Sequence, residues 1–144
     1  MIEEKIKLAI KEAEKFHGHL GPFLVLGVRM GETAKRILRI AHEENESLHI
    51  TVKVPFLTPF SCVLDGIQVT TQCTIGNQKL KIENSSKEIF AIFQYLKADK
   101  KLTITVNQKI TEDLMKKFSE GFSNEELAWE IASMPENKIF TVKK

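Results

Sequence analysis

The densest group of side chains that could do chemistry is a pair of histidines, His17 and His19, that flank a glycine in segment 16–22. On a continuous helix, residues two apart point about 200° away from each other. Gly18, Gly21 and Pro22 break the helix here, and a turning chain allows the two imidazoles to converge. Neutral imidazole is a common ligand of zinc, nickel, copper and iron. The pair by itself makes half of a metal site.

A second group follows 43 residues later, where Cys62, Asp65 and Cys73 stand within a short stretch. Two cysteines in a chain of 144 residues do not make a disulfide framework. They are free thiols, thiolate ligands or core residues. A free cysteine is most often a small buried hydrophobe, and the residue types alone therefore favour a structural role for this second group.

Periodic hydrophobic patterns predict the elements that position these residues. Apolar residues recur at helical spacing over 2–16, and again from Gly21 and Pro22 through Ala41, with proline in the first helical turn. Strict alternation predicts a strand over 48–54. Further strands are predicted over 80–82, 89–95 and 102–106, and two closing helices over 111–118 and 124–134.

The segment around the first cysteine is ambiguous from its pattern. Asp65 and Gly66 could form a hairpin turn that leads into a β-branched strand over 67–75. Alternatively, Thr58 caps a helix that begins at Pro59 and runs to about Gln72. Intrinsic propensity favours the strand slightly.

Composition sets the class of protein. Hydrophobic residues make up 42% of the chain and charged residues 28%, which is typical of one globular domain over 1–144. A formal net charge of +2 does not indicate nucleic-acid or membrane binding. The chain has no run of roughly 20 apolar residues that would span a membrane, and no signal-peptide core at its start. We therefore expect a cytoplasmic protein, in which Arg29, Arg36 and Arg39 line a solvated helix face.

Taken together, the motifs resemble a known family. The His-Gly-His segment opens a helix that contains Gly27-Val-Arg-Met-Gly31. Later come Cys-x-x-Asp-Gly-Ile-Gln at 62–68 and Cys-Thr-x-Gly at 73–76. Over about residues 5–106, this combination resembles the FmdE family, which takes its name from one of the subunits of formylmethanofuran dehydrogenase.

The resemblance implies an α+β fold with a core of helix, strand, helix and three strands, a largely antiparallel sheet, and additional C-terminal helices over 111–134. It places a helix at about 59–72. It also implies a homodimer and a divalent metal, expected to be zinc, near the histidines and the first cysteine.

The chain departs from the family pattern at three points. Many members have a cysteine where Gly21 stands, and many have a glycine where Gln72 stands. Larger members also have a cysteine-rich metal domain, which this chain lacks, so the sequence offers no basis for an iron–sulfur or redox role.

If segment 59–72 is helical, geometry distinguishes the two cysteines. On a continuous helix, Cys62 and Cys73 would lie roughly 16 Å apart at 1.5 Å per residue. That separation excludes a disulfide and prevents both thiolates from reaching one zinc ion over bonds of about 2.3 Å. Cys62 lies near the start of the helix, where the helix dipole favours a thiolate. Cys73 would join the same site only if the helix is short or a second copy approaches.

Asp65 lies one turn after Cys62 on the same face, where it could bind the metal, orient a histidine or accept a proton. The predicted metal ligands are thus His17, His19, Cys62 and Cys73, and the predicted catalytic residues are Cys62 and Asp65. His42 and His49 have no partners in the pattern, and we expect them to be surface or packing residues.

Three functions are consistent with these residues. The first is a small zinc-binding protein that acts on an unidentified small-molecule substrate. The second is a metal-free enzyme in which Cys62 is the nucleophile and a histidine its base. The third is a non-catalytic accessory subunit of a molybdenum or tungsten oxidoreductase complex.

Overall fold

The computed structural model of the chain describes residues 2–40 and 47–144. Two predictions, the extension of the second helix to Ala41 and the role of His42, lie outside the described residues. The elements follow in the order α1 (Glu4–His17), α2 (Pro22–Leu38), β1 (Leu48–Val54), η2 (Phe60–Cys62), α3 (Val63–Thr71), β2 (Leu80–Asn84), β3 (Phe90–Tyr95), η3 (Leu96–Ala98), β4 (Lys100–Val106), α4 (Gln108–Ser119), α5 (Asn124–Ser133), α6 (Glu136–Ile139) and β5 (Phe140–Lys143).

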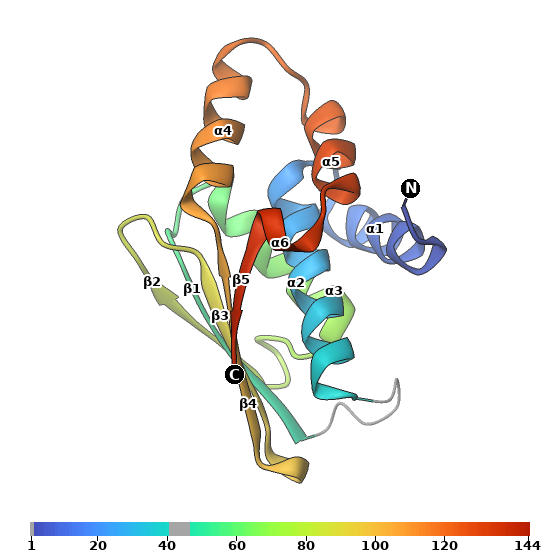
Figure 1. Cartoon of the computed structure of the whole chain (residues 1–144), viewed down its shortest axis with the longest axis vertical. Coiled ribbons are helices and arrows are strands. Elements are labelled where there is room, and N and C mark those ends of the chain that lie inside the picture. The colour runs from blue at the N-terminus through green and yellow to red at the C-terminus, as the bar shows by residue number, and fades with distance from the viewer. Residues whose placement is uncertain (1, 41–46) are drawn as a thin grey trace.

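The strands form one five-stranded sheet in the order β2-β1-β3-β4-β5, and α1, α2, α3 and α5 lie on one side of it (Figure 1). Neighbouring strands are antiparallel except β1 and β2, which are parallel. This arrangement confirms the predicted α+β class with a largely antiparallel sheet. Strand β2 pairs with β1 at the edge of the sheet and not with β3, the next strand in the chain. The connection through η2 and α3 returns the chain to the end where β1 began, so β2 runs parallel to β1, as such a crossover requires.

Strand β1 shows how the sequence pattern sets the buried face of the sheet. Its alternating apolar residues Leu48, Ile50, Val52 and Val54 are all buried, whereas His49 between them is exposed. This alternation is the period of two that a half-buried strand requires. The helices pack on the apolar face, and the buried hydrophobic residues of the described chain belong to one cluster.

Helices α2 and α3 cross at unusually short range because glycines face each other at the crossing. A Cβ atom on Gly66 would overlap the carbonyl oxygen of Leu24 and would come within 2.8 Å of the carbonyl carbon of Gly27. A Cβ atom on Gly27 would in turn overlap the carbonyl oxygen of Val63 and lie 3.1 Å from Cα of Gly66. A glycine stands at residue 66 inside the helix because the backbone of α2 crosses too close for any side chain. The sequence pattern left open whether the segment around Cys62 is a helix or a hairpin and strand. The structure shows that it is helical, through η2 and α3.

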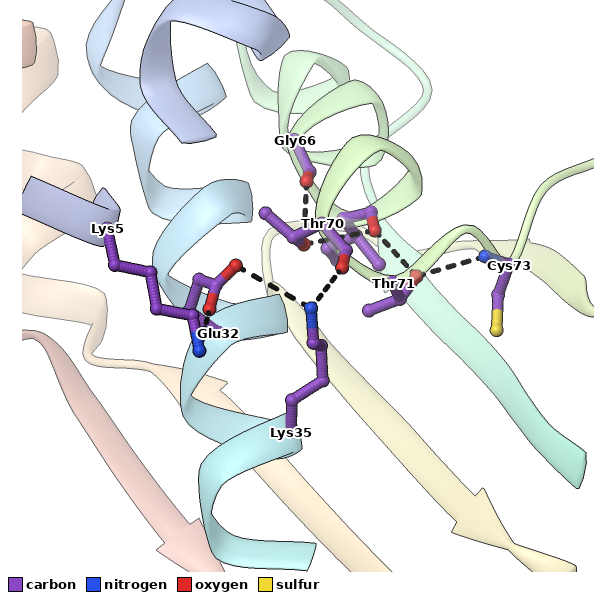
Figure 2. Close-up of polar contacts among 8 residues, drawn as sticks. Lys5, Glu32, Lys35, Gly66, Thr70, Thr71 and Cys73 are labelled. Carbon is purple, nitrogen blue, oxygen red and sulfur yellow. Dashed lines mark hydrogen bonds and ion pairs between the residues drawn. The ribbon is translucent and has the colours of Figure 1, made fainter. Parts of the chain in front are cut away.

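A buried lysine fixes the other end of α3. Lys35 of α2 is 8% exposed, and its Nζ donates a 2.8 Å hydrogen bond to the carbonyl oxygen of Thr70 (Figure 2). A cation at the C-terminal end of a helix interacts favourably with the helix dipole. Helix α3 then ends at Gln72, whose φ of 61° is left-handed. Glycine adopts this backbone conformation at less cost than glutamine does.

The C-terminal tail completes the sheet. Ile139 and Phe140 are buried, and strand β5 pairs antiparallel with β4 at the edge of the sheet. The sequence pattern did not predict a strand here. No helix in the described part of the chain is long and apolar enough to span a membrane.

We expect replacement of Gly66 by alanine to destabilise the fold. Helix propensity alone favours alanine by about 1 kcal/mol, but the added Cβ must displace the backbone of α2, and overpacking of this kind typically costs about 1–3 kcal/mol. Urea denaturation of Gly66→Ala beside the wild type measures the difference. Gly76→Ala is the matched control, because the nearest atom to its Cβ would be 3.8 Å away. An unchanged midpoint for Gly66→Ala would contradict the close crossing.

Candidate metal centre

Three of the predicted ligands come together at the junction of α1, α2 and α3. The ligand atoms of His17, His19 and Cys62 all lie within 4.8 Å of one another. Among the described residues, 2–40 and 47–144, no other group of three or more His, Cys, Asp or Glu side chains has this geometry. His17 is the last residue of α1, and Cys62 is the last residue of η2, immediately before α3. Two imidazoles and one thiol are a donor set that zinc accepts.

The two histidines converge because the chain turns sharply between them. Gly18 ends α1 in the left-handed region at φ 102°, and its N–H donates to the carbonyl oxygen of Glu14. Pro22 then opens α2 in its first turn, where its missing N–H costs nothing. The two imidazole rings lie 4.5 Å apart between centroids, at an interplanar angle of 42°. The helix break predicted from Gly18 and Pro22 therefore brings the two imidazoles together, as expected.

Asp65 holds His17 in one orientation. Its Oδ2 lies 2.6 Å from Nδ1 of His17, and its Oδ1 accepts a 3.2 Å hydrogen bond from Nε2 of Gln68. Gln68 is itself held through Oε1, which accepts a 3.1 Å hydrogen bond from the N–H of Ile75. A chain of hydrogen bonds therefore extends from Ile75, in the loop after α3, to His17. A carboxylate on one ring nitrogen is the usual partner of a metal-binding histidine.

The second nitrogen of His17 has no hydrogen-bond partner among the described residues. The His17 side chain is 13% exposed, and its Nε2 is buried without a hydrogen bond. When Nδ1–H of His17 donates its hydrogen bond to Asp65, a neutral imidazole presents a bare lone pair at Nε2. A buried polar atom without a partner costs about 1–3 kcal/mol. An ion bound by Nε2 would remove this cost, so the site fits a metal on the geometry of its own side chains.

A small cavity adjoins the three ligands. Its volume is about 20 Å³, which is enough for a single water or an ion of similar size. Besides His17, His19 and Cys62, it is lined by Gly21 and by Asn124, the first residue of α5. Asn124 was not predicted from the sequence, because it lies far along the chain from every other member of the site and its motif indicates only a helix start.

The environment of Cys62 does not favour a thiolate in the absence of a cation. Burial raises the pKa of the Cys62 thiol, and the negative charge of Asp65 raises it further. The sequence predicted that the dipole of α3 would favour a thiolate here, but these two effects outweigh it. A positive ion at the site would reverse the balance, because a coordinating thiol gives up its proton.

Cys73 lies apart from this group. Its side chain is fully buried in the core, and its Sγ donates a 3.2 Å hydrogen bond to the carbonyl oxygen of Leu48. Its N–H donates to the hydroxyl of Thr71 (Figure 2). The left-handed turn at Gln72 directs the chain toward the sheet, so the structure does not bring Cys73 to the histidines.

Two comparisons with known proteins bear on the family of the chain. The model of the family described as FmdE, molybdenum formylmethanofuran dehydrogenase operon, matches residues 16–141. The chain is also 26% identical over 158 residues to a probable S-adenosyl-L-methionine-binding protein of Archaeoglobus fulgidus. That alignment covers 95% of the chain but 42% of the relative, so the chain spans less than half of the relative's length. Because the family model extends over most of the sequence, including His17, His19 and both cysteines, the chain belongs to the FmdE family.

Proposed function

We propose that this protein binds one zinc ion through His17, His19 and Cys62 and leaves one coordination position open to a small-molecule substrate. The observation that supports this most directly is the unpartnered, buried Nε2 of His17 beside two further ligand atoms. Zinc suits this mixed set of imidazole nitrogen and thiolate sulfur. Three protein ligands and one open position are the usual arrangement of catalytic rather than structural zinc.

Gly21 keeps the fourth position free of a protein donor. Many family members have a cysteine here, whereas this chain has no side chain at all at residue 21. A Cβ atom on Gly21 would lie 3.2 Å from Oδ1 of Asn124, so the amide of Asn124 occupies the space beside it. We infer that Asn124 can hydrogen-bond a group that enters the open position.

The remaining residues position the ligands. Zinc in such a site supplies Lewis-acid chemistry, which polarises a carbonyl or lowers the pKa of water. Asp65 holds His17 through Nδ1 and is held in turn by Gln68. We therefore assign Asp65 to orient His17 rather than to bind the ion.

We expect purified protein to contain about one zinc ion per chain and Cys62→Ser to lose it, because the thiolate is one of three ligands. Asp65→Asn should retain the stoichiometry but bind zinc about 10–100-fold more weakly, as is typical when the partner of a ligating histidine is removed. Elemental mass spectrometry gives the content, and competition with a chelator gives the affinity.

Cys73→Ser is the matched control for the zinc measurement, since it changes the other thiol and leaves His17, His19 and Cys62 intact. Equal zinc loss in Cys62→Ser and Cys73→Ser would contradict the proposed ligand set. A wild-type protein that takes up no zinc when the ion is supplied would do so as well.

The metal-free alternative makes Cys62 a nucleophile, and it predicts a reactive thiol. Because burial and Asp65 raise the pKa of Cys62, we expect slow alkylation of the metal-free protein at neutral pH. The rate should increase about tenfold per pH unit until the pH exceeds the raised pKa, as only the thiolate reacts. Asp65→Asn should speed the reaction, since it removes a negative charge that disfavours the thiolate.

Cys62→Ser is the control for the alkylation measurement, because Cys73 is fully buried and should not react in the folded protein. Alkylation of Cys62 at neutral pH faster than that of an unhindered model thiol would instead favour the metal-free nucleophile.

A second candidate function is suggested by the description of the family, which refers to the operon of a molybdenum oxidoreductase. In this case the protein forms a homodimer and docks onto an oxidoreductase complex. Phe56 and Leu57, which precede the site, are 59% and 63% exposed and could contribute to such a contact. Light scattering after gel filtration should show a dimer, and Phe56→Ser with Leu57→Ser should weaken it if this loop forms the contact. A monomer at micromolar concentration would contradict the dimer.

A further inference from the structure

A second hollow lies away from the metal centre, between the start of α1, one face of α2 and the connection from α5 to α6. Its volume is about 530 Å³, which is within the range of small-molecule sites. It shares no lining residue with the small cavity at His17 and Cys62. Whatever binds here would therefore not contact the proposed zinc ion.

The three arginines of the chain, Arg29, Arg36 and Arg39, all line this hollow. The sequence pattern indicated a solvated helix face, and Arg36 and Arg39 are indeed exposed, but Arg29 is half-buried. Arginine presents a planar fork of donors that matches carboxylate and phosphate groups, which lysine does not. The chain has many lysines, so the collection of every arginine at one hollow points to an anionic group.

The floor of the hollow is formed by charged side chains that already pair with one another. Glu32 lies between two lysines, at 3.4 Å from Nζ of Lys5 and 3.8 Å from Nζ of Lys35, and Lys35 also reaches Thr70 (Figure 2). The side chains of Glu32 and Lys35 are 10% and 9% exposed. Charged residues are rarely so buried unless they are paired, and these pairs hold the floor rigid beneath the arginines.

Arg29 anchors the wall formed by the end of α5. Its Nη1 donates hydrogen bonds to the carbonyl oxygens of Ile131 and Met134. Burial lowers its pKa, although Glu136 and Glu3 act in the opposite direction.

Arg36 and Arg39 are the cations that a ligand could reach. Arg36 pairs with Glu136 at 2.5 Å, but its side chain is 62% exposed. Arg39 has neither a hydrogen bond nor an ion pair from its side chain within the described residues, and a left-handed backbone conformation places it at the end of α2. Beside them, Ile2, Ile6 and Ile40 supply an apolar wall.

We propose that this hollow binds a small organic anion, which presents a carboxylate or phosphate group to Arg36 and Arg39 and a short apolar portion to the isoleucines. The five cationic side chains that line the hollow exceed its three acidic ones, Glu3, Glu32 and Glu136. The ligand group would replace the exposed contact between Arg36 and Glu136 and would partner Arg39.

The test is titration of the full chain at low salt, followed by amide chemical shifts, with inorganic phosphate in one arm and the dicarboxylate glutarate in the other. We expect saturable binding of at least one probe with a Kd of about 1 mM or tighter, and shifts at α2 and at the connection from α5 to α6. The arm that binds more tightly identifies the group as phosphate or carboxylate. Arg36→Gln with Arg39→Gln should weaken binding at least about tenfold, because each variant loses charge-assisted hydrogen bonds to the anion.

The matched control is Lys109→Gln with Lys116→Gln, which removes the same charge from exposed positions on α4. This control and Cys62→Ser should both bind as the wild type does, the latter because the hollow is separate from the zinc site. Both arginines are exposed, so thermal unfolding should show that the double variant is folded. Saturation by neither probe, or equal weakening by the lysine and arginine double variants, would overturn the proposal.

Discussion

The contact between the backbones of α2 and α3 is the constraint on which the site depends. Gly27 and Gly66 face each other where the helices cross, and a side chain at either position would overlap backbone atoms of the other helix. The short separation brings Cys62, which immediately precedes α3, and Asp65, in the first turn of α3, against the turn that contains His17 and His19. A glycine inside a helix costs about 1 kcal/mol relative to alanine, so the close approach is obtained at the expense of helix propensity.

Once the crossing is fixed, the polar contacts of the site follow in sequence. Asp65 faces His17 because it lies one turn into α3, and Gln68, one turn further, supports Asp65 from behind. The result is an oriented imidazole with a free, buried nitrogen next to a thiol whose pKa is raised. The unpartnered nitrogen is unfavourable in an empty site. A bound cation would satisfy this nitrogen and would favour the thiolate form of Cys62. The arginine-lined hollow is formed by later residues of α2, such as Arg29 and Arg36. Helix α2 therefore contributes both to the candidate metal centre, through its first turn, and to the hollow.

Much of the fold was predictable from local pattern. Strict alternation predicted β1 with the bounds that the structure has, and Gly18 with Pro22 predicted the break that separates α1 from α2. Segment 59–72 could not be decided in this way, because Val69, Thr70 and Thr71 favour a strand and only the packing of Gly66 against α2 favours a helix. The resemblance to the FmdE family supplied this information. The parallel pairing of β2 and the strand at β5 depend on contacts between distant segments, and local periodicity does not record them.

The site was predictable in part for the same reason. Histidine spacing and the Cys-x-x-Asp motif identified the residues that converge, because each group lies at a helix boundary that the sequence marks. The position of Cys73 depends on the left-handed conformation of Gln72, and that of Asn124 on how α5 packs against α2. X-ray absorption of the zinc-loaded protein tests the central claim most directly. The account predicts one sulfur at about 2.3 Å and two nitrogens at about 2.0–2.1 Å from the metal. Two sulfur ligands, or a shell of oxygen alone, would contradict it.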